Sequence, residues 1–186
     1  MQSIYSFLPI AGKLREHIAY LTGNVLMCNS PTMEKLLNTG TTIICDRYAF
    51  SGIAFSASKV TACGDPLLSF EWCKNPDIGL PAPDLVLFLD ITPEKAKERG
   101  AYGEERYEKV EMQKRVREIF HRIGDDMRKE AILGGDGVGT QWVIIDAGRD
   151  QNAVAKDIWA SVENLVTKGV EGSVKKLWTA EKRRAI

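Results

Sequence analysis

The chain has 186 residues, a mass of 20.7 kDa and 44% hydrophobic residues, which suffices for one globular domain with a buried core. Its 25 basic residues balance 25 acidic residues, so no global field draws the protein to nucleic acid or to an anionic membrane. No apolar stretch approaches the roughly 20 residues that span a bilayer, and the first residues lack the pattern of a signal peptide. We therefore expect a soluble protein of the cytosol or nucleus, without nucleic-acid or membrane partners.

The four cysteines agree with that compartment. Cys28, Cys45, Cys63 and Cys73 show neither CxxC spacing nor histidine partners at zinc-site distances. Cys45 lies inside an apolar stretch. The pattern predicts free thiols in a reducing compartment.

The first 40 residues predict two short helices. Apolar residues recur at helical spacing at positions 14, 18 and 21, which predicts a helix over residues 12–21. A second helix is expected over residues 33–37, with Thr32 as its N-cap and Gly40 just beyond its end.

Three continuous apolar runs predict strands. They span residues 41–45, 85–89 and 142–145, and the residues that follow them are Asp46, Asp90 and Asp146. Continuous rather than alternating apolarity is typical of strands buried on both faces, as in a parallel sheet. The carboxyl ends of such strands are where open α/β sheets bind ligands.

Helices are expected between and after these strands. They cover residues 51–59, 69–74, 105–130 and 152–168, and the long one carries the apolar stripe Met112, Val116, Ile119, Ile123 and Met127. Strands that alternate with helices predict an α/β sandwich with a parallel sheet. The glycine-rich run at residues 133–139 precedes a strand instead of following one, so it is read as a surface connection and not as a phosphate loop.

Asp46 and Arg47 are the first residues that suggest chemistry. The planar guanidinium offers a fork of N–H donors that suits phosphate oxygens, and the helix expected from Ser51 adds free N–H groups nearby. The alternative is a strand-end ion pair that only caps the sheet. No Gly-x-x-x-x-Gly-Lys-Ser/Thr phosphate loop occurs in the printed sequence.

A second charged stretch covers residues 99–108, where Arg99 and Arg106 bracket flexible glycines. Two such arginines could form a lid that closes over phosphates. The alternative is a solvated helix start with acidic residues in its first turn. Gln113 lies two turns after Arg106 on the same helix face, although a lone glutamine is usually just exposed.

Three passages together resemble eukaryotic thymidylate kinase (dTMP kinase). They are Asp-Arg-Tyr-Ala-Phe-Ser-Gly-Ile-Ala-Phe at 46–55, Pro-Asp-Ile-Gly-Leu-Pro-Ala-Pro-Asp-Leu-Val-Leu-Phe-Leu at 76–89, and Arg-Gly-Ala-Tyr-Gly-Glu-Glu-Arg-Tyr-Glu at 99–108. Their order, spacing and identity all match. The first and third disfavour a guanylate or adenylate kinase.

The resemblance implies the three-layer fold of P-loop nucleoside monophosphate kinases and transfer of the ATP γ-phosphate to dTMP. The product is dTDP, a precursor in dTTP biosynthesis, and Mg²⁺ is the expected cofactor. The similar domain is expected at residues 33–178, after a divergent segment at 1–32 and before a basic tail at 179–186. A homodimer follows from the resemblance alone.

The resemblance also implies roles for the charged residues. Arg47 would hold the dTMP phosphate and help to span donor and acceptor, and Asp46 would organise Mg²⁺ through water. Arg99 and Arg106 would belong to the lid over ATP. These four are the expected catalytic residues.

On the nucleoside side, Ser51, Gly52 and Phe55 would line the pocket. Tyr107 would pack beside the deoxyribose, and Gln113 would lie near thymine.

The sequence departs from the family in two places. Residues 1–9 lack the opening strand and glycine-rich loop, and residues 26–32 replace a Phe-Ser-Ala-Asn-Arg-Trp passage. The missing strand would lie between the strands at 41–45 and 85–89, and each unpaired buried backbone group there costs about 1–3 kcal/mol. We therefore expect a fragment of a longer protein or a faulty gene model, and negligible kinase activity from the chain as printed. The rival hypothesis is a non-catalytic remnant that binds dTMP or a partner chain.

Overall fold

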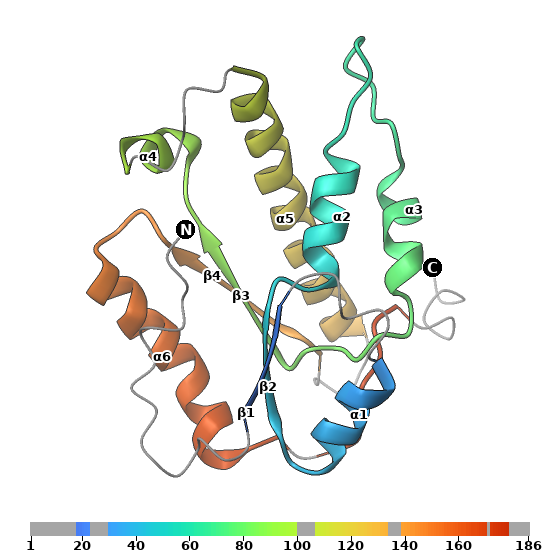
Figure 1. Ribbon diagram of the computed structural model, residues 1–186, viewed down its shortest axis with the longest axis vertical. Helices are drawn as coiled ribbons and strands as arrows, with labels where there is room; N and C mark the ends of the chain where they lie inside the picture. The colour runs from blue at the N-terminus through green and yellow to red at the C-terminus, as the bar shows by residue number, and fades with distance from the viewer. Residues whose placement is uncertain (1–17, 23–29, 100–106, 134–138, 171, 179–186) are drawn as a thin grey trace. The chain divides into compact units, whose positions relative to one another are not determined.

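The computed structural model describes residues 18–22, 30–99, 107–133, 139–170 and 172–178 (Figure 1). In chain order the elements are β1 (Ile18–Thr22), α1 (Ser30–Asn38), β2 (Thr42–Asp46), α2 (Ala49–Ala57), α3 (Phe70–Lys74), η4 (Asn75–Asp77), β3 (Leu85–Asp90), α4 (Pro93–Glu98), α5 (Tyr107–Leu133), β4 (Gln141–Asp146) and α6 (Gln151–Lys168). The described strands form two parallel pairs, β1 with β2 and β3 with β4. The α/β class and the parallel pairing predicted from the sequence are confirmed.

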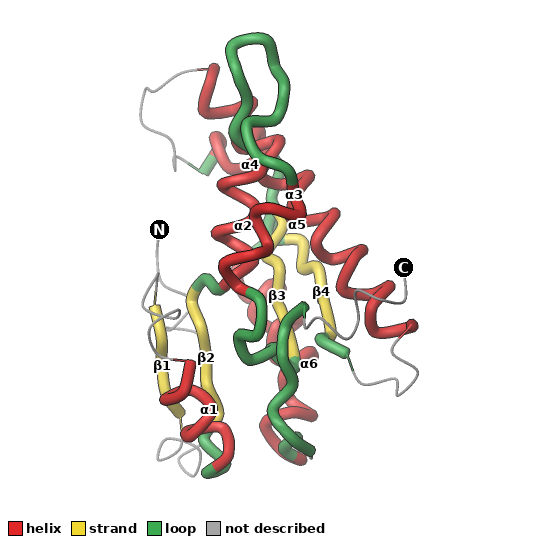
Figure 2. The backbone as a smooth tube through the Cα atoms, turned by 90° about the vertical axis from the view of Figure 1, so that its right-hand side faces the viewer, coloured by secondary structure: helices red, strands yellow, loops and turns green. Residues whose placement is uncertain are grey.

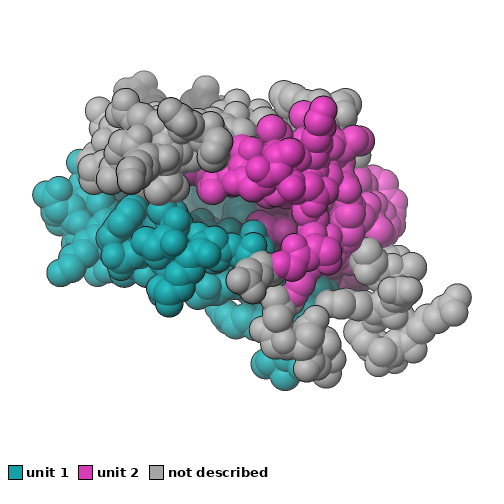
Figure 3. Space-filling view, turned by 90° about the horizontal axis from the view of Figure 1, so that it is seen from below, with its two compact units in different colours: residues 1–9, 84–170 teal, residues 10–83, 171–186 magenta. Residues whose placement is uncertain are grey.

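The chain divides into two compact units, coloured separately in Figure 3. Unit 1 comprises residues 1–9 and 84–170, and unit 2 comprises residues 10–83 and 171–186. Each unit has its own parallel strand pair and its own helices.

Unit 2 contains a strand where the sequence predicted a helix. Ile18–Thr22 pairs in parallel with β2, in register from Ile18↔Thr42 to Thr22↔Asp46. Three apolar residues at helical spacing are a weak local signal, whereas Ile18, Tyr20 and Thr22 are β-branched or aromatic and favour strands. Pairing with β2 also satisfies backbone groups that a short helix would leave open at its ends. The helix prediction is therefore wrong for residues 18–21, and residues 12–17 lie outside the described part.

Helix α1 begins earlier than predicted. It starts at Ser30, so Thr32 lies in its first turn and is not the N-cap. Pro31 suits this turn because its missing N–H has no intrahelical partner there. Gly40 lies beyond the helix with a φ of 79° and donates its N–H to the Leu37 carbonyl at 2.9 Å, which confirms the predicted end.

The core of unit 2 lies between α2, α3 and residues 172–178. Helices α2 and α3 lie side by side (Figures 1 and 2), and Ser69 caps α3 by accepting a hydrogen bond from the Trp72 N–H at 3.2 Å. The buried apolar residues here are Ala49, Phe50, Ile53, Ala54, Phe70, Cys73, Leu80, Leu177 and Trp178. The last two belong to residues 172–178, which we call the C-terminal strap.

Unit 1 is built on the β3–β4 pair, whose register runs from Leu85↔Gln141 to Asp90↔Asp146. Helices α5 and α6 both pack on β4. Of the predicted α5 stripe, Val116, Ile123 and Met127 are buried, while Met112 and Ile119 are half-buried. Helix α4 was not predicted; its signal is local, an N-cap threonine followed by proline at Thr92-Pro93.

The bounds of the predicted strands are confirmed to within one residue at each end. Their predicted burial on both faces is not confirmed. β2 and β3 are at most half-buried, and Ile144 of β4 is 39% exposed. Each strand has one hydrogen-bonded neighbour among the described strands, so no second neighbouring strand among them covers its side chains.

Cys45, Cys63 and Cys73 are free thiols as predicted, and Cys28 lies outside the described residues. Residues 1–9, 26–29, 134–138 and the tail 179–186 also lie outside them. Within the part of the chain that the structure describes, no helix is both long and apolar enough to cross a membrane.

The C-terminal strap supplies the first testable prediction. Leu177 is 2% exposed, so Leu177→Ala removes a fully buried side chain and should lower the free energy of unfolding by about 2–5 kcal/mol. Urea denaturation followed by circular dichroism measures this change. Ile132→Ala is the control, because Ile132 is 80% exposed and its loss should change stability by less than about 0.5 kcal/mol. Equal effects of the two substitutions would contradict the packing described here.

Candidate functional site

In unit 2, the connection between β2 and α2 carries the predicted phosphate-binding residues. Asp46 is the last residue of β2, paired in register with Thr22 and exposed. Arg47 follows with a φ of 67°, in the left-handed region that residues other than glycine rarely adopt. Such a conformation costs on the order of 1–3 kcal/mol and persists where the surrounding structure holds it. Strain of this kind is characteristic of functional sites.

Helix α2 presents one buried face and one open face. Ala49, Phe50, Ile53 and Ala54 are buried. The predicted pocket residues are Ser51, Gly52 and Phe55, of which Ser51 is half-buried, Gly52 exposed and Phe55 36% exposed. Their spacing places them together on the face opposite the core. The helix begins at Ala49, two residues before the predicted start, so Arg47 lies directly before the N-terminal end that favours anions.

Gly52 leaves room on this open face. A Cβ atom built on Gly52 would meet nothing within 4 Å, so packing of the described residues does not demand a glycine. Glycine inside a helix is about 1 kcal/mol less favourable than alanine. The unfilled space suits the close approach of a bound molecule to the helix backbone.

Two ionisable groups near this connection stay protonated at neutral pH. Burial raises the pKa of Cys45 to about 11. Burial also raises the pKa of Tyr48, with smaller contributions from Cys45 and Asp77. Neither the Cys45 thiol nor the Tyr48 phenol therefore brings a negative charge to this connection at neutral pH.

The predicted magnesium role of Asp46 can be tested for chemical fit. Mg²⁺ typically binds one or two carboxylates and completes its shell with waters and substrate phosphates. Asp46 offers one exposed carboxylate at a strand end, which fits this mode. No group of three or more possible ligands gathers among the residues that were described.

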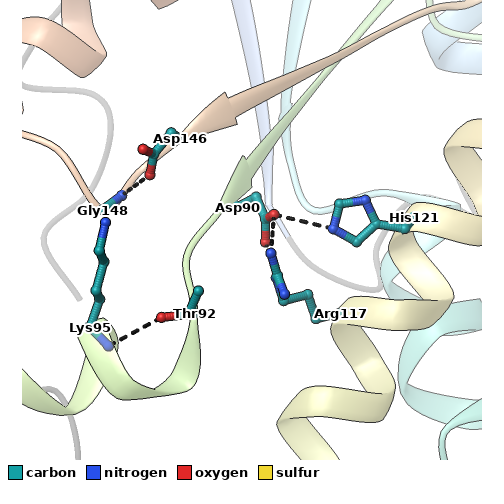
Figure 4. Close-up of polar contacts among 7 residues, drawn as sticks. All are labelled: Asp90, Thr92, Lys95, Arg117, His121, Asp146 and Gly148. Carbon is teal, nitrogen blue, oxygen red and sulfur yellow. Dashed lines mark hydrogen bonds and ion pairs between the residues drawn. The ribbon is translucent and has the colours of Figure 1, made fainter.

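In unit 1, the end of β3 holds a polar cluster that sequence reasoning missed (Figure 4). Arg117 of α5 donates two hydrogen bonds to Asp90, from Nε to Oδ1 at 2.5 Å and from Nη2 to Oδ2 at 2.7 Å. His121 Nε2 lies 3.1 Å from Asp90 Oδ2. The Phe88 ring, two residues earlier on β3, stacks on Phe120 with centroids 4.8 Å apart. The signals were the strand-ending aspartate and the i, i+4 spacing of Arg117 and His121, but only the helix placement joins them.

The electrostatics of Asp90 follow from this geometry. Burial alone would raise the pKa of the carboxyl group, whose side chain is 12% exposed. The hydrogen bonds and charge of Arg117, with a contribution from His121, outweigh burial and lower the pKa below its usual value. A bidentate guanidinium is the strongest common partner for a carboxylate.

The turn after β4 lies against α4, which is also in unit 1. The Gly148 N–H donates to Asp146 Oδ1 at 2.8 Å, and the Lys95 side chain passes close by (Figure 4). A Cβ on Gly148 would lie 2.7 Å from Lys95 Cδ, so a larger residue here would displace the flexible end of the Lys95 side chain. Arg99, the C-cap of α4, donates to the Arg149 carbonyl. The structure thus places Arg99 at a helix end, against this turn.

The other predicted site residues divide as follows. Asp46, Arg47, Ser51, Gly52 and Phe55 come together in unit 2, whereas Arg99 and Gln113 belong to unit 1. Gln113 is half-buried on α5. Tyr107 is the first residue of α5, although its side chain is outside the described part, and Arg106 lies wholly outside it.

Comparison with known proteins gives one consistent result. Residues 15–158 match the family description of thymidylate kinase. The thymidylate kinase of Arabidopsis thaliana is 40% identical over 181 residues, which cover 96% of this chain and 61% of that protein. The Danio rerio thymidylate kinase is 38% identical over 178 residues, covering 95% of this chain and 76% of the relative.

A solved structure agrees with the sequence matches. The thymidylate kinase of Candida albicans superimposes with a TM-score of 0.56 and 29% identity, covering 80% of this chain and 66% of that one. The chain thus spans about three fifths of the Arabidopsis relative and about two thirds of the Candida structure.

The Asp90 cluster predicts a pH-dependent contribution to stability. Because the folded pKa of Asp90 is lowered, its stabilisation is complete above the unfolded value near 3.9 and is lost as pH falls through the folded value. Asp90→Asn should lower the free energy of unfolding by about 1 kcal/mol at pH 7, an amount discounted because Arg117 is 39% exposed. Urea titrations between pH 7 and pH 3 measure the free energy of unfolding of both proteins. The difference between Asp90→Asn and wild type should shrink below about pH 4.

Asp125→Asn is the matched control, because Asp125 pairs with Arg128 at 2.8 Å within the same helix but both side chains are largely exposed. Its substitution should change stability little at any pH. A pH-independent difference between wild type and Asp90→Asn would contradict the electrostatic account of Asp90.

Proposed function

Because this chain belongs to the thymidylate kinase family, we propose that it binds dTMP and acts as a phosphotransferase that moves the γ-phosphate of ATP to dTMP, giving dTDP. The observation that carries the proposal is the strained Arg47, set at the end of β2 and directly before the open face of α2. Arg47 suits the phosphate of a nucleotide, and the open face of α2 suits its nucleoside.

On the acceptor side, the guanidinium of Arg47 binds the dTMP phosphate. Ser51, Gly52 and Phe55 contact the nucleoside, with Gly52 permitting its close approach. Phosphoryl transfer spreads charge over the equatorial oxygens of the moving group, and an arginine that stabilises this charge is worth about 10³–10⁵ in rate. Arg47 therefore acts both in binding and in the transition state.

Asp46 is the residue that would hold Mg²⁺ through water, and the ion when bound neutralises charge on the phosphates. Arg99 and Arg106 close over ATP, which requires Arg99 to exchange its bond to the Arg149 carbonyl for a phosphate oxygen. Tyr107 packs against the deoxyribose and Gln113 lies near thymine. These roles are carried over from the family, residue by residue.

We propose further that the chain as printed transfers phosphate slowly. Its sequence contains no Gly-x-x-x-x-Gly-Lys-Ser/Thr motif, whose backbone N–H groups and lysine cradle the phosphates of ATP in P-loop kinases. The location we propose is the cytosol or nucleus, and a homodimer remains an inference from the family.

A second candidate function is dTMP binding without catalysis. The acceptor-side residues 46–55 all lie in the described part of the chain, while the donor-side motif is missing from the sequence. Such a protein would act by sequestering dTMP or by binding a partner chain.

Binding and turnover separate these possibilities. Calorimetry should show that dTMP binds, and a coupled assay of ADP release with ATP, Mg²⁺ and dTMP should give turnover far below the usual kinase range of about 1–100 s⁻¹. Arg47→Ala should weaken dTMP binding, because it removes the charged partner of the phosphate, by about tenfold or more. Arg128→Ala, which removes an exposed arginine of α5, is the control and should bind dTMP normally.

Turnover within the usual range would support the kinase and contradict its impairment. Absence of dTMP binding would contradict both candidate functions.

Gly52 should show opposite effects on stability and binding. Gly52→Ala meets open space in the helix interior, so it should raise the free energy of unfolding by about 0.5–1 kcal/mol. The added methyl group should weaken dTMP binding, because the ligand approaches the same space. Denaturation and calorimetry on one preparation measure both effects.

The control is Asn164→Ala on the exposed surface of α6, which should also improve helix propensity but leave dTMP affinity unchanged. Full dTMP affinity in Gly52→Ala would remove Gly52 from the proposed pocket.

A further inference from the structure

The backbone conformation of Arg47 is unfavourable for an arginine and must be stabilised by neighbouring residues. Its φ of 67° places it in the left-handed region, although it is neither glycine nor asparagine. A strained residue keeps such a conformation only if the residues beside it are fixed. On one side, Asp46 is fixed by its pairing with Thr22 in the β1–β2 ladder.

On the other side, Tyr48 is tied to a distant part of unit 2. Its hydroxyl donates a hydrogen bond of 2.7 Å to the carbonyl oxygen of Pro81, 33 positions along the chain. Its ring also meets Phe50 edge to face, with centroids 6.1 Å apart. Since burial raises the pKa of the phenol, the hydroxyl keeps its proton and remains a donor across the physiological range.

The acceptor of this hydrogen bond is itself held in place by the C-terminal strap. The Gly79 N–H donates to Leu177 O, the Leu177 N–H to Leu80 O, and the Ala82 N–H to Lys175 O, each at 2.8 Å. Pro81 and Lys176 form an antiparallel bridge within these bonds.

Side chains of the strap secure it on the same unit. The Lys176 ammonium pairs with Glu34 of α1. Trp178 meets Phe50 edge to face at 5.9 Å, and Phe50 in turn contacts Tyr48. The strap therefore reaches Tyr48 by two routes, through the Pro81 carbonyl and through the Phe50 ring.

From these contacts we propose that Tyr48 is a positioning residue that holds Arg47 in its phosphate-binding conformation, and that the C-terminal strap is the support for Tyr48. The inference rests on the proposed function, because it takes Arg47 as the ligand of the dTMP phosphate. Tyr48 acts through Arg47 and does not touch the nucleotide. Loss of its hydroxyl should therefore affect recognition of the phosphate and spare recognition of the nucleoside.

The experiment compares dTMP with thymidine, which lacks the phosphate. In Tyr48→Phe the ring and its packing remain and only the hydrogen bond to Pro81 is lost. Calorimetry with the full chain should show dTMP affinity reduced about three- to tenfold and thymidine affinity unchanged. Ser161→Ala is the control, because it removes a hydroxyl that donates to the Asp157 carbonyl at 2.8 Å in α6, and it should change neither affinity.

A double substitution tests whether Tyr48 acts through Arg47. In Arg47→Lys the bidentate guanidinium is already lost, so adding Tyr48→Phe should weaken dTMP binding by much less than it does in the wild type. Additive losses would overturn the proposal, because Tyr48 would then contribute independently of Arg47.

Other outcomes are equally decisive. Equal weakening of dTMP and thymidine in Tyr48→Phe would show a general structural role and overturn the proposal. So would an unchanged preference for dTMP over thymidine. If the wild type shows no preference for dTMP over thymidine, the proposed function fails, and this inference fails with it; a normal wild-type preference that survives in Tyr48→Phe overturns this inference alone.

Discussion

Parallel backbone pairing is the constraint on which the polar architecture of this protein depends. Two parallel strands end at the same edge, so the register brings Asp90 and Asp146 to one edge of the β3–β4 pair. The same rule places Asp46 at the end of the β1–β2 pair, where the chain must turn into α2. Neither the arginine clamp on Asp90 nor the strained Arg47 could form if a strand slipped, because a one-residue shift turns every side chain to the opposite face.

The elements with a continuous apolar run or a regular apolar stripe were predicted from the sequence. β3 and β4 are short apolar runs between polar residues, and α5 carries a long regular stripe, so both kinds of element were found to within a few residues. β1 was misassigned because its five residues have a weak local pattern and become a strand only when β2 lies beside them. Helix α4 was not predicted, although Thr92 and Pro93 form a local helix-start signal.

The candidate site, too, could be predicted only where its signals are local in the sequence. The family resemblance pointed to residues 46–55, and the structure gathers the predicted members of that stretch around the start and open face of α2. It could not reveal that Arg47 has a positive φ, or that Tyr48 is tied to Pro81. Both depend on contacts between segments that are distant in sequence. The Asp90 cluster was hidden for the same reason, since its partners lie 27 and 31 positions further along the chain.

The C-terminal strap also has a consequence for how the protein is made. Lys176 pairs with Glu34 across 142 positions, so unit 2 begins near the start of the chain but is completed only by its last described segment. On the ribosome, residues 84–170 emerge as a continuous stretch and can fold first, whereas the backbone of residues 79–82 must wait for its partners. Contacts between segments so far apart in the sequence generally form late in folding. During synthesis, Phe50 therefore lacks its Trp178 partner until residues 172–178 emerge, and a chain released early would lack the strap that pairs with residues 79–82.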